Sequence, residues 1–138
     1  MQKGHSDTET QGIRVRVGAQ YLPDQSDPER SVYLYAYRVV IQNEGELPAQ
    51  LLSRHWIISD AIGERREVRG PGVVGEQPLL APGEKFEYTS SSRLATEWGS
   101  MEGSYQMKRA DGTLFDARIG RFFLARNLAP ILPASSDE

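Results

Sequence analysis

A largely apolar run that carries a tryptophan lies near the middle of the chain and reads Leu51-Leu52-Ser53-Arg54-His55-Trp56-Ile57-Ile58-Ser59-Asp60. Its content of Leu, Ile and Trp is typical of a strand in the core of a sheet. A glycine-rich segment with the spacing G-x-G-x-x-G follows soon after, Val68-Arg69-Gly70-Pro71-Gly72-Val73-Val74-Gly75-Glu76-Gln77-Pro78. The first segment indicates the kind of fold, and the second is a candidate ligand-binding motif.

Strands are predicted on the N-terminal side of the apolar run. From Ile13 to Ala19, apolar residues alternate with Arg or Gly, which is the period of a half-buried strand. Residues 31–42 are mostly apolar or aromatic on both faces, so we expect them to form a central strand. A short turn at residues 43–46 predicts that residues 49–59 return antiparallel to it.

Strands are predicted on the C-terminal side as well, at residues 65–68, 86–89, 101–108 and 114–124. The pair Asp111-Gly112 suits a tight hairpin turn whose twist matches that of the strands it joins. Residues 90–99 are rich in Ser and Thr, with an isolated Trp98, and are expected to form a loop. No window free of Gly and Pro keeps the apolar spacing of a helix over a useful length.

About seven short antiparallel strands and no helix predict an all-β protein with an immunoglobulin-like β-sandwich. A small barrel is the less favoured alternative. The chain has no cysteine for an inter-sheet disulfide, so a fibronectin type III-like sandwich is the better match. We expect one domain at residues 13–128, a disordered N-terminal lead-in at residues 1–12 and a polar C-terminal tail at residues 129–138.

Composition restricts the class of protein. The length of 138 residues favours a single domain with its own core. The formal net charge of -3 argues against non-specific nucleic-acid binding, which needs a basic surface. The absence of cysteine excludes disulfides, thiolate catalysis and Cys-ligated zinc. The N-terminal residues lack the apolar core of a secretory signal, and no apolar run has the length of a membrane span. We therefore expect a cytoplasmic protein with neither nucleic acid nor membrane as a partner.

The glycine motif allows two interpretations once a dinucleotide site is excluded. That site needs a helix directly after the glycines, and Pro71, Pro78 and Pro82 prevent one. One remaining interpretation is an anion-binding loop of backbone amides. Its candidate ligand-binding residues are Arg69, Gly70, Gly72 and Gly75, with Arg54 as a further source of charge. The other interpretation, which we favour, is that the glycines only permit positive φ angles in a loop between two sheets.

No catalytic or metal-binding grouping is found in the sequence. His55 is the only histidine outside the N-terminal segment, and the carboxylates are scattered. No nucleophile elbow, phosphate-binding loop or Ser-His-Asp order is present. We expect a protein that is not an enzyme, with no cofactor and no metal. Six arginines would form a basic patch if the first strand neighboured the third and fourth, although solvated strand faces are the favoured interpretation: Arg14, Arg16, Arg54, Arg65, Arg66 and Arg69.

The order of several residue blocks resembles the ApaG family, also called CorD. Besides the two segments quoted above, the blocks are Tyr21-Leu22-Pro23, Tyr35-Ala36-Tyr37, Asn43-Glu44-Gly45, Leu80-Ala81-Pro82-Gly83, Phe86-Glu87-Tyr88-Thr89-Ser90 and Gly99-Ser100-Met101-Glu102-Gly103-Ser104-Tyr105. The chain departs from the family pattern at Ser91-Ser92-Arg93 and at Trp98. The resemblance implies a fibronectin type III-like sandwich, no established catalytic activity, and an association with cobalt resistance and magnesium efflux.

The resemblance and the residues together lead to a functional hypothesis. We expect a non-enzymatic module that mediates protein–protein interaction through a sheet edge or a loop end of the sandwich. The alternative is a binder of pyrophosphate-containing small molecules, such as nucleotides or diadenosine polyphosphates, through the Gly70–Gly75 loop. Exposed sheet edges are compatible with a monomer or a weak homodimer.

Overall fold

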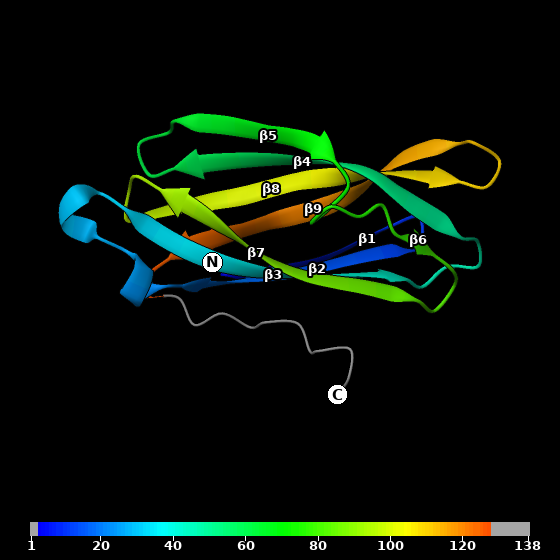
Figure 1. Cartoon of the computed structure of the whole chain (residues 1–138), viewed down its shortest axis with the longest axis horizontal. Helices are drawn as coiled ribbons and strands as arrows, with labels where there is room; N and C mark the ends of the chain where they lie inside the picture. The colour runs from blue at the N-terminus through cyan, green and yellow to red at the C-terminus, as the bar shows by residue number, and fades with distance from the viewer. Residues whose placement is uncertain (1–2, 128–138) are drawn as a thin grey trace.

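The computed structural model describes residues 3–127. Over these residues the chain forms nine strands and two short 3-10 turns, and its strands make two antiparallel sheets (Figure 1). In chain order the elements are β1 His5–Thr10, β2 Ile13–Tyr21, η1 Pro23–Gln25, η2 Pro28–Arg30, β3 Tyr33–Asn43, β4 Ala49–Asp60, β5 Arg65–Pro71, β6 Leu79–Leu80, β7 Lys85–Leu94, β8 Trp98–Arg109 and β9 Leu114–Ala125.

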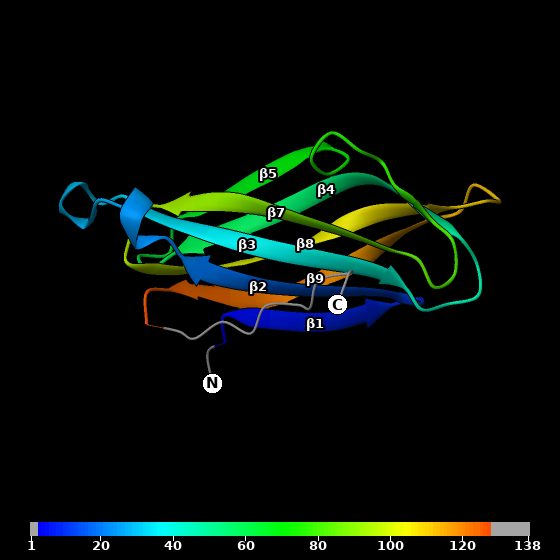
Figure 2. The same ribbon diagram turned by 60° about the horizontal axis from the view of Figure 1, so that its bottom comes forward.

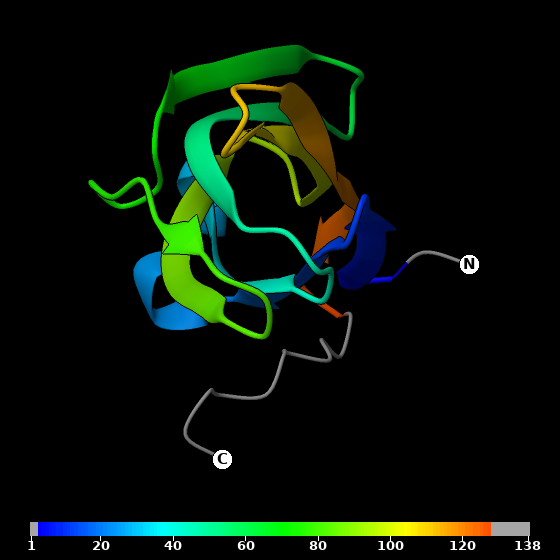
Figure 3. The same cartoon turned by 90° about the vertical axis from the view of Figure 1, so that its right-hand side faces the viewer.

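The strand order confirms the predicted sandwich. One sheet has the order β1-β2-β3-β7, and the other has the order β5-β4-β8-β9 with the two-residue β6 paired to β4. Without β1 and β6, three strands face four in the arrangement of a fibronectin type III domain. Figure 3 views this sandwich end-on. The predicted hairpin is also confirmed, because Gly112 has a φ of 89° and Arg109 N donates to Thr113 O at 2.8 Å.

The core lies between the two sheets and is centred on aromatic residues. Tyr35 and Tyr105 are fully buried, and Trp56 is 2% exposed. The Trp56 ring meets Tyr37 edge-on, with 5.2 Å between ring centroids, and it also packs edge-on against Tyr105 and Phe122. This packing explains why the apolar run around Trp56 forms a central strand.

The predicted disorder of the lead-in, residues 1–12, is wrong for most of that segment. His5–Thr10 forms β1, which pairs along its whole length with β2, from His5 opposite Gly18 to Thr10 opposite Ile13. The segment has no apolar residue to reveal a strand, because its inward-facing side chains are hydroxyls that bind β9. The predicted tail, residues 129–138, lies outside the described residues.

The predicted loop at residues 90–99 is also mostly strand. β7 continues to Leu94 and β8 begins at Trp98, so only residues 95–97 connect them. Ser92 lies opposite Tyr35 in the ladder and is only 8% exposed, so a small hydroxyl side chain occupies an inward position. β5 likewise extends to Pro71, beyond the predicted end at Val68.

Candidate binding groove between two sheet edges

One side of the sandwich is closed by side-chain hydrogen bonds. β1 lies beside β9, as Figure 2 shows. Ser6 Oγ donates to Gly120 O at 2.7 Å, and Thr8 Oγ1 donates to Arg118 O at 2.7 Å. Thr10 Oγ1 in turn accepts from Arg118 N at 3.0 Å. The hydroxyls at every second position of β1 therefore satisfy backbone groups of β9 that would otherwise form an open sheet edge.

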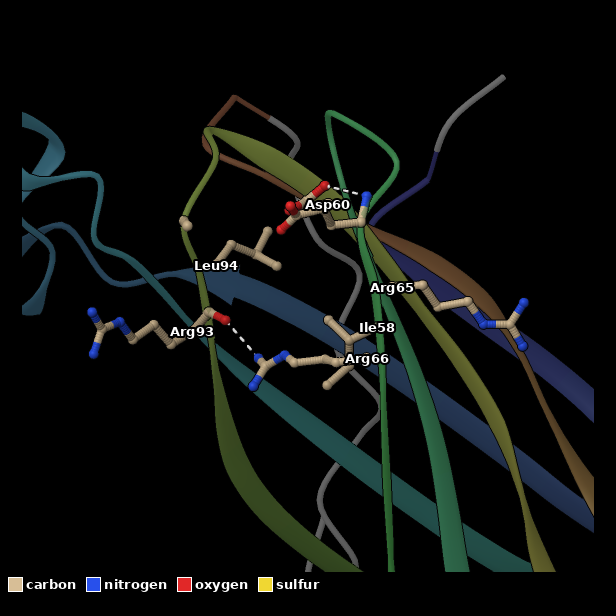
Figure 4. Close-up of a pocket in the computed structure, with 8 residues that line it drawn as sticks. Ile58, Asp60, Arg65, Arg66, Arg93 and Leu94 are labelled. Atoms are coloured by element: carbon tan, nitrogen blue, oxygen red, sulfur yellow. Dashed lines mark hydrogen bonds between the residues drawn. The ribbon is translucent and has the colours of Figure 1, made fainter.

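The opposite side, between β5 and β7, holds a groove. Two hollows of about 390 and about 250 Å³ adjoin there, because Ile58, Arg66 and Arg93 line both of them. Figure 4 shows the larger hollow, with Arg66 reaching from β5 toward the backbone of Arg93 on β7. Arg66 Nη2 donates to Arg93 O at 2.6 Å and lies 3.5 Å from Ser92 Oγ. A single side chain therefore spans the two edges.

The free edge of β7 faces this groove. Within residues 3–127, β7 pairs with β3 alone. Alternate residues of a strand direct their backbone groups to opposite neighbours, and the bond from Arg66 marks the Arg93 carbonyl as pointing away from β3. Ser91 and Thr89 have the same parity, so their N–H and C=O groups also point toward the open side.

The smaller hollow is lined mainly by hydrogen-bond donors. Arg54, Arg66, Ser90 and Ser92 contribute to its wall, together with Tyr37, and none of the described residues that line it is Asp or Glu. Arg54 Nη1 donates to Pro71 O at 2.9 Å and to Gly72 O at 3.0 Å. Both acceptors are neutral carbonyls, so the Arg54 charge is oriented by these bonds and not neutralised by them.

A buried phenol cluster lies close to Arg54. Burial raises the pKa of Tyr37, of Tyr88 and of Tyr105, while the nearby charge of Arg54 opposes the rise. The hydroxyls of Tyr88 and Tyr105 share a hydrogen bond. At neutral pH these phenols are therefore uncharged, and they do not compensate the positive charge of the groove.

The structure shows what backbone space and φ angles the glycines of the loop provide, and where Arg69 points. Gly70 is part of β5, and a Cβ atom there would lie 3.0 Å from the guanidinium nitrogens of Arg54. Gly72 has a φ of 61°, and a Cβ atom would lie 2.3 Å from Glu76 O. Gly75 has a φ of 82°. Arg69 is exposed and donates to Glu67 Oε1 at 3.2 Å, so its side chain does not turn to the loop.

The amides of the glycine loop are largely used within the fold. Gly72 N donates to Leu52 O at 2.8 Å. Val73 N and Glu76 O are 2.8 Å apart, and Glu76 N donates back to Val73 O at 2.9 Å. The loop also turns the carbonyls of Pro71 and Gly72 toward Arg54. This geometry favours a structural role for the glycines.

The six arginines considered as a patch do not converge. Arg14 and Arg16 lie on β2, which runs between β1 and β3 in the other sheet. Arg54 and Arg66 do line one hollow, and Arg93 lines it as well. Arg93 was missed because its segment was predicted to be a loop. The alternation from Phe86 to Leu94 would have placed it on a strand, since every second position continues the period of β7.

His55 has a local partner on the outer face of its sheet. Its Nε2 lies 2.7 Å from Glu67 Oε1, and this hydrogen bond, followed by the one from Arg69, lowers the pKa of Glu67. Across the part of the chain that the structure describes, no three His, Asp or Glu side chains are grouped to hold a metal ion. The same part contains no helix long and apolar enough to cross a membrane.

Comparison with known proteins gives the family. The ApaG domain profile matches residues 23–109. The chain belongs to the ApaG family. The ApaG domain match includes β3, β4, β5 and β7, which are the strands around the groove.

Relatives and solved structures support the same assignment. Protein ApaG of Pseudomonas aeruginosa is 60% identical over 120 residues, which cover 87% of this chain and 94% of the relative. Protein ApaG of Dechloromonas aromatica is 57% identical over the same shares of the two chains. The crystal structure of the putative ApaA protein from Bordetella pertussis matches with a TM-score of 0.80 and 47% identity, covering 92% of this chain and 98% of that chain. The resemblance found in the sequence is thereby confirmed.

Proposed function

We propose that this member of the ApaG family is a non-enzymatic binding module of the cytoplasm that recognises a protein partner through the open edge of β7. The observation that carries the proposal is the difference between the two sides of the sandwich. Hydroxyls of β1 cover the edge of β9, whereas Thr89 and Ser91 direct backbone groups toward a groove, next to the Arg93 carbonyl that Arg66 binds. An extended segment of a partner can add to such an edge as a further strand.

The charged residues on the outer face of β7 favour binding of a specific partner over self-association. Lys85 and Arg93 place charges along the edge strand, and charges on an edge discourage pairing between identical copies. A monomer that pairs with a partner strand fits these features. In this proposal, the cobalt resistance and magnesium efflux implied by the family resemblance are effects of the partner.

The experiment compares Ser91→Pro with Ser91→Ala. Proline removes the outward N–H and blocks strand addition, but it leaves the β3 ladder intact because that N–H points away from β3. Random peptides displayed on phage are the probe. We expect the parent chain and Ser91→Ala to enrich a common set of peptides and Ser91→Pro to lose it, with thermal unfolding verifying that both variants fold. Equal enrichment by all three chains, or turnover of a metabolite by the purified protein, would contradict the proposal.

The alternative, a pyrophosphate-binding loop at Arg69, Gly70, Gly72 and Gly75, has less support in the geometry. Gly72, Val73 and Glu76 already donate their amides within the fold. A titration with inorganic pyrophosphate followed by backbone NMR separates the two ideas, because an anion loop requires shifts centred on these amides.

A further inference from the structure

We propose that the smaller hollow beside β7 is an anion site that receives an acidic side chain, Asp or Glu, of the segment that pairs with β7. The inference rests on the proposed function and names the chemistry of the partner. Arg54, Arg66, Ser90 and Ser92 are the residues that would hold the carboxylate.

Strand register places the side chains of these four residues on the inward faces of the two sheets. Arg54 lies opposite Gly70, and Arg66 lies opposite Ile58, an inward-facing residue of β4. Ser90 and Ser92 pair with inward-facing tyrosines of β3. Side chains alternate between the faces of a strand, so donors from β4, β5 and β7 reach the same hollow.

The described residues that line the smaller hollow include no carboxylate to balance its arginines. Six of the ten other arginines in residues 3–127 pair with acids: Arg14 with Asp7 and Glu44, Arg30 with Asp27, Arg38 with Glu87, Arg69 with Glu67, Arg121 with Glu102 and Arg126 with Glu97. Arg54, Arg66 and Arg93 form no ion pair among these residues, and Arg54 and Arg66 donate hydrogen bonds to carbonyl or hydroxyl oxygens. Positive charge held in place by neutral acceptors is suited to a carboxylate, which a guanidinium binds through two parallel hydrogen bonds.

Position favours a side chain of a bound segment over a free ligand. A strand added to β7 would align residues with Ser90 and Ser92, and those residues would point inward over the hollow. An acidic residue at such a position brings its carboxylate to Arg54 and Arg66.

The probes are three synthetic peptides of alternating Val and Thr that carry Glu, Gln or phosphoserine at one central position. We expect the Glu peptide to bind the parent chain about tenfold or more tightly than the Gln peptide, because a hydrogen bond to a charged group exceeds one between neutral groups. Arg66→Gln should reduce this ratio to near one. Arg121→Gln, the same change of charge on β9, is the matched control and should keep it.

The outcomes separate this inference from the proposed function. Equal binding of the Glu and Gln peptides, abolished by Ser91→Pro, would retain the edge and overturn the anion site. Stronger binding of the phosphoserine peptide than of the Glu peptide would overturn the assignment to a carboxylate.

A titration with acetate alone tests the anion site without the edge. We expect shifts of the side-chain N–H signals of Arg54 and Arg66 in NMR spectra, and their absence would overturn the site. If acetate shifts these signals while none of the peptides binds, the edge fails and the inference that an acidic side chain of a paired strand fills the site fails with it.

Discussion

Asn43 shows at the scale of one residue how a polar side chain organises this fold. It is fully buried at the end of β3. Its Nδ2 donates to Leu47 O at 2.8 Å and to Leu80 O at 3.0 Å, and its Oδ1 accepts from Gly45 N at 2.9 Å. One amide thus joins the turn after β3 to β6, and every hydrogen bond that it makes is to the backbone.

Replacing Asn43 by Ala should destabilise the protein strongly. The change removes, at a fully buried position, the donor to the carbonyls of Leu47 and Leu80 and the acceptor of Gly45 N, so we expect the free energy of unfolding to fall by about 2–4 kcal/mol. Urea unfolding at equilibrium measures the loss. Gln42→Ala is the control, because the side chain of Gln42 is on the outer face of the sheet and should contribute only about 0.5 kcal/mol or less. Similar losses for the two variants would refute this role of Asn43.

At the scale of an element, β1 acts as a cover for the edge of β9. Its backbone pairs with β2, and its hydroxyls reach β9 in the other sheet. Arg14 on β2 adds a two-point bond to Asp7 on β1, at 2.8 and 2.6 Å, which lowers the pKa of Asp7. β1 therefore connects the two sheets through side-chain hydrogen bonds on the side that faces β9.

The double substitution Ser6→Ala with Thr8→Val tests this cover. It removes two hydrogen bonds and leaves Gly120 O and Arg118 O without their donors, so we expect a loss of about 1 kcal/mol for each bond. The matched control is Thr89→Val with Ser91→Ala, which makes the same kinds of change on the outward positions of β7. Urea unfolding should separate the two double variants, and an equal stability for both would disprove the covering role of β1.

At the scale of the whole molecule, the interior contains several phenols. Burial raises the pKa of Tyr35, Tyr37, Tyr88 and Tyr105, so the folded state favours their protonated forms. In the unfolded chain tyrosine ionises near pH 10. Their stabilising contribution is therefore complete below about pH 10 and is lost as the pH rises beyond it, because only the unfolded chain releases these protons.

The molecule should consequently unfold in alkali with a recognisable signature. We expect ionisation of the tyrosines to leave the free energy of unfolding unchanged at neutral pH. Above about pH 10 it should lower this free energy steadily. Tyrosinate absorbance should appear in the folded protein at higher pH than in the urea-unfolded chain, in which all 6 tyrosines titrate freely. Coincident titration curves for the folded and unfolded chains would contradict the burial of these phenols.

Much of the architecture could be predicted because strand formation leaves a local pattern. Alternation around Val15 and Tyr35 and the apolar run around Trp56 indicated strands that the core then buries. The turn at Asp111-Gly112 was readable because its backbone requires particular residues. The family was also recognisable from residue blocks, and the comparisons confirm it.

Polar strands and the groove depended on contacts that no local window contains. β1 is a strand because Ser6 and Thr8 meet β9, more than 100 positions away in the chain. The groove exists because Arg54, Arg66 and Arg93 come from β4, β5 and β7 and reach one hollow. Periodicity is a property of neighbouring residues, whereas the partner of a polar edge and the meeting of distant charges are set by how the sheets pack. The chain's own pattern was thus sufficient for the sandwich and the family, and only the packing of the two sheets decided which edge is covered and which is open.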